Sequence, residues 1–421
     1  MNHALLEGKQ IVVGVTGSIA AYKALELIRL YVKAGAKVRV IMTASAMRFI
    51  SPLSFEAISQ HEVLHEASES WANDNNHIDI GKWADLLVLA PATANTLNKI
   101  AHGIADNLLT QTILAYPKEK LFAPAANTNM FKNPLTTASL KMIKMVNAQI
   151  IEPVTKELAC GDVGEGALAE VEEIFYKSAQ MLLQDAFWSN RRVVVSGGGT
   201  IEKIDDVRYI SNFSSGKMAA ALSKALYLKG ADVCLVTTKV DPSLPKAIYT
   251  VEVEDAKEMQ EYLTDALRVA KKGIMTKPTL MGEGMPELIQ KTPYLFMAAA
   301  VSDYKVRFQQ KGKLKKEALG KLWSLELEEN TDILMNIDKE GVFAVGFKAE
   351  MDKESGKENA KNMLIKKNLD AVCFNDVGAN SFGSDDNAIT LFTKTQVKVL
   401  PQSDKFSLSL ALLDALASMS E

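Results

Sequence analysis

The sequence predicts an α/β protein with two domains, each built on a doubly wound parallel sheet. Three observations support this prediction: short β-branched runs alternate with helix-length segments, a glycine-containing turn follows the first run of each half, and the pattern restarts near residue 190. Strands that alternate with helices are typical of βαβ units, and such turns are typical of Rossmann-like nucleotide-binding folds. The 421 residues also exceed what one hydrophobic core can organise, because single cores stop growing at about 250–300 residues.

In the first half, four short apolar runs predict strands at Ile11–Val15, Val38–Met42, Leu86–Leu89 and Leu121–Ala123. Longer segments between and after them predict helices at Ile19–Ala34, Ala94–Ala115 and Val171–Gln184. The second half begins with a strand at Arg192–Ser196, a helix near Lys217–Lys229 and a strand at Val233–Thr237. The polar segment Asp185–Arg191 is interpreted as the linker, which divides the chain into domains 1–188 and 189–421.

The composition excludes several classes of function. There are 48 Lys and Arg against 51 Asp and Glu, so the chain lacks the basic field that nucleic-acid binding needs. The three cysteines lie far apart, which argues against disulfides and for a reducing compartment. The charge-free stretch Leu86–Asn98 is interrupted by Pro91 and is shorter than the roughly 18 residues of a spanning helix, and no secretory signal is visible. We therefore expect a cytoplasmic protein with neither membrane nor nucleic-acid partners.

The end of the first predicted strand offers a binding site for an anion. Gly17 and Ser18 follow this strand and precede a helix, so backbone N–H groups and a hydroxyl meet at a helix N-terminus. The dinucleotide fingerprint is absent, since the glycine spacing is wrong and the second strand ends in Thr43 and Ser45 rather than in an acid. Hydroxyls there favour a mononucleotide phosphate. A tight turn with a helix cap is the alternative.

Two further loops follow buried strands at the same edge of the predicted sheet. The small residues of 90–96 could cradle a planar ring, and Asn127 follows the fourth strand. Cys160 lies in a glycine-dense stretch that would expose its thiol. Each feature has a plainer alternative: Asn127 as a turn residue, Cys160 as a small filler and His77 as a surface imidazole.

The second half contains two glycine-rich turns. Three successive glycines, 197–199, follow a strand and can form an N–H concavity for an anion, and Ser214-Ser215-Gly216 opens a helix. Two such turns favour a triphosphate, with a dinucleotide reductase as the rival interpretation. The segment Lys305–Lys321 carries seven basic residues and one acid, which is typical of a solvated face or of a lid that closes on phosphate. The stretch Lys271–Pro293, with three prolines, is interpreted as an inserted loop.

The order of motifs in the first half resembles the flavin-dependent cysteine decarboxylases. The matching pieces are Gly17-Ser18-Ile19-Ala20-Ala21-Tyr22-Lys23, Asn76-His77-Ile78, residues 91–96, Asp106-Asn107-Leu108-Leu109, a Pro-Ala-x-Asn-x-x-Met stretch and Ala159-Cys160-Gly161. The resemblance implies a flavodoxin-like flavoprotein domain that binds FMN through Gly17, Ser18, Ile19, Thr43, Pro91, Thr93, Ala94 and Asn95. It further implies that FMN oxidises a cysteinyl thiol toward a thioaldehyde so that carbon dioxide is lost. By the same resemblance His77 is the acid/base, Asn127 orients the substrate carboxylate and Cys160 is the proton donor.

The whole chain resembles the bacterial bifunctional phosphopantothenoylcysteine decarboxylase and phosphopantothenate–cysteine ligase family of coenzyme A biosynthesis. The second-half matches are residues 207–218, 298–304, 313–316, Asn330-x-Asp332-Ile333, 345–347 and 367–370. The resemblance implies a nucleotide-binding ligase domain that uses CTP and Mg²⁺ or Mn²⁺ to activate 4′-phosphopantothenate as an acyl-cytidylate, which cysteine then attacks. It implies a CTP site of Gly198, Gly199, Ser214, Ser215, Gly216, Ala300, Asp303, Lys313, Asn330, Asp332, Ile333, Phe347 and Lys367. Asn212 would aid conversion of the acyl-cytidylate, Lys313 would reach the triphosphate, and Asp303 is the expected metal ligand.

Three positions depart from the family pattern. Ala167 stands where a basic residue often follows the glycine loop, Ala126 stands where Met commonly precedes the asparagine, and Met363 stands where a second nucleotide-contacting lysine can occur. Lys361 or Lys366 is a candidate to compensate for Met363. We expect ligation to precede FMN-dependent decarboxylation of 4′-phosphopantothenoylcysteine to 4′-phosphopantetheine. The alternatives are a non-catalytic flavin-binding regulatory protein and a pyridine-nucleotide reductase in the second half. The family also implies homo-oligomers, with a trimer-based decarboxylase core that can extend to a dodecamer and with ligase dimers.

Overall fold

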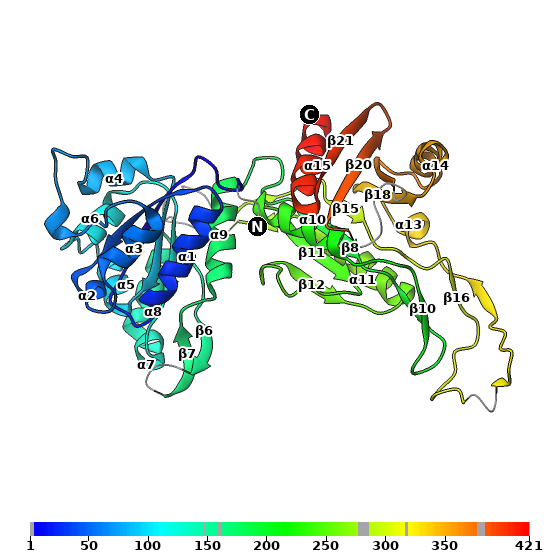
Figure 1. Cartoon of the computed structure of the whole chain (residues 1–421), viewed down its shortest axis with the longest axis horizontal. Coiled ribbons are helices and arrows are strands. Elements are labelled where there is room, and N and C mark those ends of the chain that lie inside the picture. The colour runs from blue at the N-terminus through cyan, green and yellow to red at the C-terminus, as the bar shows by residue number, and fades with distance from the viewer. Residues whose placement is uncertain are drawn as a thin grey trace. The chain divides into compact units, whose positions relative to one another are not determined.

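The computed structural model describes residues 4–146, 148–157, 161–276, 286–315, 319–376 and 384–420. It contains two compact units, one of Met1–Leu183 with Thr276–Glu287 and one of Gln184–Met275 with Leu288–Glu421 (Figure 1). In the part of the chain that the structure describes, none of the helices combines the length and apolar character that crossing a bilayer requires.

The first unit is built on a parallel sheet of five strands: β1 (Gln10–Val15), β2 (Lys37–Met42), β3 (Leu86–Ala92), β4 (Lys120–Pro124) and β5 (Ala148–Ile150). Their order in the sheet is β2-β1-β3-β4-β5. This is the flavodoxin-like order, in which ligands bind where the strand order reverses, beside β1 and β3. The fold class predicted for this half is confirmed.

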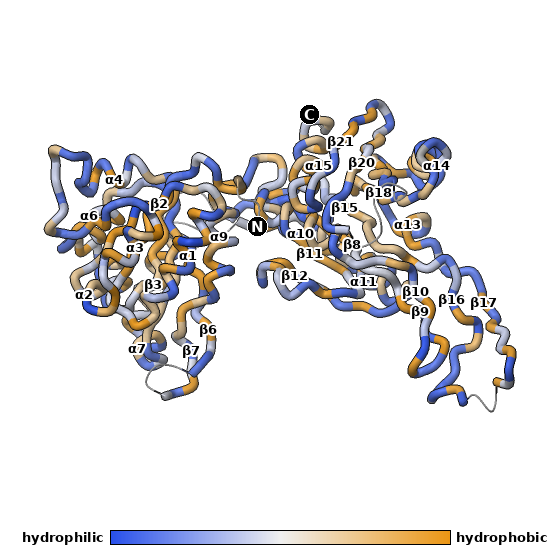
Figure 2. Tube along the Cα trace, in the orientation of Figure 1, coloured by the Kyte–Doolittle hydropathy of each residue, from blue (hydrophilic) through white to orange (hydrophobic). Residues whose placement is uncertain are grey.

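Helices cover both faces of this sheet: α1 (Ala21–Lys33), α2 (Ala44–Met47), α3 (Pro52–Ser59), α4 (His77–Trp83), α5 (Ala94–Ala101), α6 (Leu108–Ala115), α7 (Thr128–Lys132), α8 (Pro134–Lys144) and α9 (Val171–Leu183). Alternate strand residues such as Val12 and Leu87 join α4, α5, α6 and α8 in one core. The helices α1 and α9 pack together, with the Tyr31 hydroxyl 2.6 Å from Ser178 Oγ and the Tyr31 ring 5.8 Å from Phe175. Figure 2 shows mostly hydrophobic residues along β3, which the two layers of helices bury.

One local prediction for the first unit was wrong, and one element was missed. The single helix predicted over 94–115 is two helices, α5 and α6, because Gly103 turns the chain with φ +68° and Asn107 caps α6 by accepting a hydrogen bond from Thr110 N at 3.0 Å. A β-hairpin, β6 (Val154–Glu157) and β7 (Val163–Ala167), flanks the glycine-dense stretch and was not predicted. Glycine-rich, polar strands carry little periodic signal.

The second unit has an eight-stranded sheet: β8 (Arg192–Gly197), β11 (Asp232–Thr237), β12 (Tyr249–Glu252), β15 (Tyr294–Met297), β18 (Phe343–Glu350), β19 (Ala371–Asp376), β20 (Asp386–Thr393) and β21 (Val397–Asp404). The order is β12-β11-β8-β15-β18-β19-β20-β21. The first six strands in this order, ending at β19, are parallel and form a Rossmann-like sheet, whereas β20 and β21 are antiparallel. This hairpin brings the C-terminal part of the chain back to the sheet.

Helices of the second unit are α10 (Lys217–Leu228), α11 (Ala256–Ala270), α13 (Ile333–Asn336), α14 (Lys353–Lys366) and α15 (Lys405–Ser420). Small two-stranded ribbons pair β9 (Ile201–Lys203) with β10 (Tyr209–Ser211), β13 (Ile274–Met275) with β14 (Leu288–Ile289), and β16 (Tyr304–Val306) with β17 (Leu327–Glu329). The ribbon of β13 and β14 lies in the segment predicted as an inserted loop. In the other ribbon, β16 overlaps the start of the basic segment Lys305–Lys321 and β17 follows its end. The segment predicted as the linker is packed into this unit, since Trp188 is fully buried and its Nε1 donates to Leu413 O at 3.3 Å.

Candidate functional site

Each unit has a cavity at the carboxyl ends of its parallel strands. The cavity of the first unit has a volume of about 480 Å³ and is lined by the loops that follow β1, β2, β3 and β4. The residues predicted for FMN or substrate binding that line it are Gly17, Ser18, Thr43, Thr93, Ala94, Asn95 and Asn127. We call this cavity the first pocket. The strand order alone explains why residues so distant in sequence meet there.

Close packing at the entrance to α1 requires glycine. A Cβ on Gly17 would lie 2.5 Å from Ser45 Cβ and 3.1 Å from the Ser45 carbonyl carbon. The neighbouring Ser18 Oγ accepts a hydrogen bond from Ala20 N at 3.2 Å. The loops after β1 and β2 therefore lie close enough together for their backbone N–H groups and hydroxyls to hold one small anion.

A buried hydroxyl connects the loops after β1 and β3. Thr16 Oγ1 donates to Pro91 O at 2.6 Å and accepts from Thr93 N at 3.0 Å. Thr93 in turn caps α5, because its Oγ1 accepts from Thr96 N at 3.4 Å. Pro91 was predicted as a flavin contact. It is buried, its carbonyl accepts the hydrogen bond from Thr16, and it does not line the pocket.

Two other predicted residues, His77 and Ile19, lie outside the first pocket, and a third is not described. His77 is the first residue of α4, where the buried Asn76 side chain accepts from Ile78 N at 3.0 Å, and it does not line the first pocket. Its Nδ1 lies 3.0 Å from Glu69 Oε1, and its ring meets Trp71 edge-on at 5.7 Å. Ile19 is also absent from the lining residues and is exposed. Cys160 lies outside the described residues.

An ion pair in the first pocket was not predicted. Lys99 Nζ lies 2.5 Å from Asp106 Oδ2, and both side chains line the pocket. The hydrogen bond from Lys99 lowers the pKa of Asp106 below its ordinary value. Asp106 stands in a motif quoted for the resemblance, but the sequence gives no signal that α5 would present Lys99 to it.

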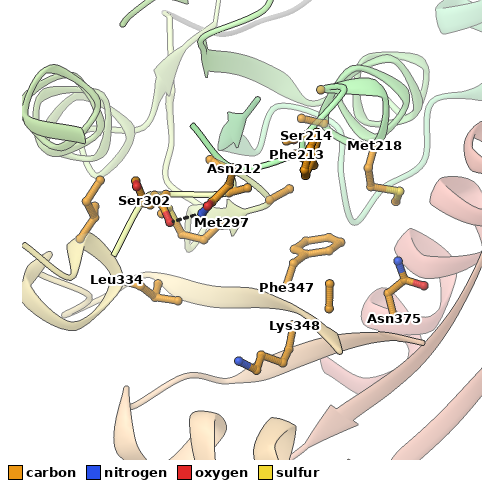
Figure 3. A pocket seen from close by; sticks show the side chains of 18 of the residues that line it. Asn212, Phe213, Ser214, Met218, Met297, Ser302, Leu334, Phe347, Lys348 and Asn375 are labelled. Atoms are coloured by element: carbon orange, nitrogen blue, oxygen red, sulfur yellow. Dashed lines mark hydrogen bonds between the residues drawn. The ribbon is translucent and has the colours of Figure 1, made fainter. Parts of the chain in front are cut away.

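The cavity of the second unit, the second pocket, has a volume of about 680 Å³. It is formed by the loop before α10, the loop after β15, α13, and the ends of β18 and β19 (Figure 3). The predicted residues that line it are Asn212, Ser214, Ser215, Gly216, Ala300, Asp303, Asn330, Asp332, Ile333, Phe347 and Lys367. This pocket lies beside β8 and β15, where the strand order of this sheet reverses.

Gly198 and Gly199 support the wall of the second pocket rather than lining it. Ala300 N donates to Gly198 O at 2.8 Å, and Thr238 Oγ1 donates to Gly199 O at 2.9 Å. Gly198 has φ +78°, and a Cβ there would overlap Thr238 Oγ1. Only glycine fits at this position without strain.

Hydrogen bonds fix several polar side chains around the pocket. Asn212 Nδ2 donates to Val301 O at 3.0 Å, and Figure 3 shows the Phe347 ring pointing into the same space. Asp332 caps α13 through Met335 N at 3.0 Å and pairs with Lys367 Nζ at 2.8 Å. Burial alone would raise the pKa of Asp332, but the bonds from Lys367 and Met335 N hold it below its ordinary value, so the carboxylate stays charged.

Two buried polar atoms at this pocket have no hydrogen-bond partner among the described residues: Asn330 Nδ2 and Asn375 Oδ1. Buried polar atoms are nearly always paired, so both are suited to contact a bound molecule. The described residues contain no cluster of three or more His, Cys, Asp or Glu side chains that could hold a metal ion alone. Asp303 and Asp332 both line the pocket, and Mg²⁺ commonly uses one or two carboxylates together with substrate phosphates.

Lys313 does not line the second pocket. Its segment is attached to the turn before β10: Gly312 N donates to Asp206 Oδ2 at 2.8 Å, and Leu314 N donates to Asp205 Oδ2 at 3.1 Å. Arg208 Nη2 also donates to Leu314 O at 3.1 Å. We call residues 312–314 with their partners Asp205, Asp206 and Arg208 the latch.

Sequence reasoning missed other residues of this pocket. Met363 does line it, but neither Lys361 nor Lys366 does, and the Lys361 ammonium lies 5.9 Å from the Phe392 ring instead. The additional lysines that line it are Lys348 and Lys405. Lys348 directly follows the predicted Phe347 and could have been noticed. The position of Lys405 depends on the antiparallel hairpin β20–β21.

Comparisons with known proteins agree with this division into two functional halves. Residues 2–183 match the Flavoprotein family, and residues 188–279 and 276–419 match the DNA/pantothenate metabolism flavoprotein C-terminal domain. The coenzyme A biosynthesis bifunctional protein CoaBC of Haemophilus influenzae is 36% identical over 415 residues, which are 97% of this chain and 97% of that protein. The CoaBC protein of Bacillus subtilis is 36% identical over 426 residues, 99% of this chain and 98% of its own. A solved structure of a mutant PPC decarboxylase complexed with pantothenoylaminoethenethiol is 37% identical, covers 40% of this chain and 96% of its own, and has a TM-score of 0.38.

Proposed function

Because the chain belongs to the family of coenzyme A biosynthesis bifunctional proteins, we propose that it catalyses two consecutive steps of that pathway. It is an enzyme with a ligase half and a carboxy-lyase half. The second half joins 4′-phosphopantothenate to cysteine, and the first half decarboxylates 4′-phosphopantothenoylcysteine to 4′-phosphopantetheine. The observation that carries this conclusion is the match of both halves to bifunctional relatives over nearly the whole chain.

The first pocket fits FMN as the resident cofactor. The cradle at Gly17, where a Cβ would meet Ser45, and the hydroxyls of Ser18 and Thr43 suit its phosphate, and the small residues 93–95 leave room for its ring. Bound FMN would supply the two-electron oxidation of the substrate thiol that makes loss of the carboxyl group easy. The match to the Flavoprotein family supports this assignment.

The chain's own side chains then orient the substrate and move protons. Asn127 lines the first pocket and would orient the substrate carboxylate. His77 would act as the acid/base, with Glu69 fixing the imidazole at 3.0 Å, and Cys160 would donate the proton that completes the product. His77 does not line this pocket in its own chain, so we propose that it serves the pocket of a neighbouring subunit. A homo-oligomer that is trimer-based and able to extend to a dodecamer is what the family resemblance implies for such an assembly.

The second pocket is proposed to bind CTP. Backbone and hydroxyl groups at Ser214–Gly216 suit its phosphates, and the Phe347 ring offers a flat surface for its base. Asp303 and the triphosphate together would hold Mg²⁺ or Mn²⁺. Asn212 would stabilise the acyl-cytidylate, and Lys313 would reach the triphosphate once the latch opens. Ligase halves are proposed to pair as dimers, and the free thiols of Cys234 and Cys373 fit a cytoplasmic enzyme.

One experiment tests both activities. The purified chain is examined for a flavin spectrum and is mixed with 4′-phosphopantothenate, cysteine, CTP and magnesium while products are followed by mass spectrometry. A yellow protein that yields CMP and 4′-phosphopantetheine supports both halves. Accumulation of phosphopantothenoylcysteine would count against the decarboxylase half alone, and a colourless, inactive chain would overturn the proposal.

A further inference from the structure

Among the described residues, three lysine side chains line the second pocket, and they differ in what neutralises their charge. Lys367 lies 2.8 Å from Asp332, and Lys348 lies 3.0 Å from Glu350. Lys405 has no carboxylate at ion-pairing distance in the part of the chain that the structure describes; its ammonium donates to the backbone oxygen of Ser384. Lys405 is therefore the pocket cation whose charge is left for a ligand.

The surroundings of Lys405 make an uncompensated positive charge costly. It is the first residue of α15, and the start of a helix carries partial positive charge. Burial and the nearby Lys217 lower the pKa of Lys405, with Asp385 and Asp386 opposing them. Asp385 is itself engaged by Lys217 at 2.6 Å. A bound anion would offset the positive charge of Lys405.

A second feature of the same pocket also favours an anion. The residues before α10, Ser214 to Gly216, line the pocket together with Lys405. The N-cap of this helix, Gly216, has no side chain to satisfy the first N–H groups. An ammonium group and an uncapped helix start therefore face one cavity of about 680 Å³, which has room for a polyphosphate.

We propose that Lys405 contacts the β- and γ-phosphates of the nucleotide, which lie between this side chain and the start of α10. The proposal rests on the assignment of CTP to the second pocket and extends it to a residue that the family resemblance did not single out. Lys405 would hold the leaving pyrophosphate in place and balance its charge as the acyl-cytidylate forms. It would also supply the cation that Met363, which lines the same pocket, does not.

The test compares the full chain with Lys405→Met, which removes the charge and keeps the apolar stem, and with Lys405→Arg, which keeps the charge. Lys394→Met is the matched control, because Lys394 lies between β20 and β21, is largely exposed and does not line the pocket. Binding of CTP, CDP and CMP is measured by calorimetry with magnesium, and thermal melting checks that each variant folds.

We expect Lys405→Met to weaken CTP binding about 10- to 100-fold, the loss typical of one charged hydrogen bond, and to leave CMP binding within about twofold. Lys405→Arg should retain most of the CTP affinity, and Lys394→Met should behave as the unaltered chain. Unchanged CTP binding in Lys405→Met, or an equal loss of affinity for CTP and CMP, would overturn the proposed phosphate contact of Lys405 and leave the proposed ligase function standing. If the unaltered chain binds no CTP, the proposed ligase function fails first, and this inference fails with it.

Discussion

Asp205 Oδ2 accepts a hydrogen bond from Leu314 N at 3.1 Å, which places a buried carboxylate directly beneath the segment that carries Lys313. The same carboxylate accepts from Val207 N and Arg208 N at 2.8 and 2.7 Å. Burial alone would raise the pKa of Asp205, but these N–H groups hold it below its ordinary value. The carboxylate therefore stays ionised at neutral pH and keeps the latch closed.

Removal of this carboxylate should release the Lys313 segment. We expect Asp205→Ala to increase tryptic cleavage after Lys313 and Lys315 about tenfold, because three backbone N–H groups lose their acceptor. Cleavage is measured by mass spectrometry at neutral pH. Asp241→Ala is the control, since the Asp241 side chain accepts only a local bond from Ser243 N at 2.8 Å among the contacts described. Equal cleavage in both variants would show that the latch does not restrain this segment.

The close approach at Gly17 makes a prediction about flavin binding. The additional Cβ of Gly17→Ala would lie 2.5 Å from Ser45 Cβ and would force the loops after β1 and β2 apart. We expect flavin affinity to fall about 5- to 150-fold, measured from the flavin absorbance retained after gel filtration, since overpacking costs about 1–3 kcal/mol. Gly81→Ala should retain its flavin, because the nearest atom to a Cβ there, in Tyr116, is 3.9 Å away. Full retention of flavin by Gly17→Ala would show that the close approach at Gly17 is not needed for flavin binding.

The sequence predicted β1 to β4 of the first sheet and β8 and β11 of the second, because these strands are short, apolar and β-branched, but it did not predict the remaining strands of either sheet. It also predicted which loops meet, because parallel strands end at one edge. That rule alone brought Gly17, Thr93 and Asn127 to one pocket. It could not place His77, whose surroundings depend on Glu69 and Trp71 in irregular backbone. Irregular segments have no periodicity from which contacts can be read.

Lys405 shows the other limit of prediction. Its place in the second pocket follows from β20 and β21, two antiparallel strands added to an otherwise parallel sheet. Register between antiparallel strands is set by the turn and by packing across the whole sheet, so a local sequence pattern does not determine it. Lys313 was predicted to serve the pocket from a mobile lid, and the latch that holds its segment uses Asp205 and Arg208, about 100 residues away in sequence.

The contact between His77 and Glu69 makes a prediction about decarboxylation. We expect His77→Asn to slow decarboxylation about 100- to 10,000-fold, the usual contribution of a general acid or base, and Glu69→Gln to slow it less, since Glu69 acts only through the imidazole. Ligation serves as an internal control, because the second pocket lies in the other unit. The measurement is the accumulation of phosphopantothenoylcysteine by mass spectrometry at constant flavin content. Normal decarboxylation by His77→Asn would remove His77 from the mechanism.

The cysteines give a prediction that depends on pH. Burial raises the pKa of Cys234 to about 11, and burial also raises the pKa of Cys373. A raised thiol pKa favours the neutral form, so at pH 8 only roughly one part in a thousand of Cys234 is the reactive thiolate. The glycine-dense sequence around Cys160 predicts an accessible thiol, so the native chain should bind one equivalent of maleimide quickly, at Cys160, whereas the unfolded chain should bind three, one for each cysteine.

Two controls make this labelling decisive for Cys160. Cys160→Ser should abolish the fast equivalent at pH 8, and labelling of Cys234 should increase as the pH is raised toward 11, because its thiolate fraction grows over that interval. Fast labelling that survives in Cys160→Ser would mean that Cys234 or Cys373 opens to solvent and that the glycine-dense stretch does not present a reactive thiol. Loss of the fast equivalent together with loss of decarboxylation, while ligation continues, would connect the accessible thiol to the proton-donating step.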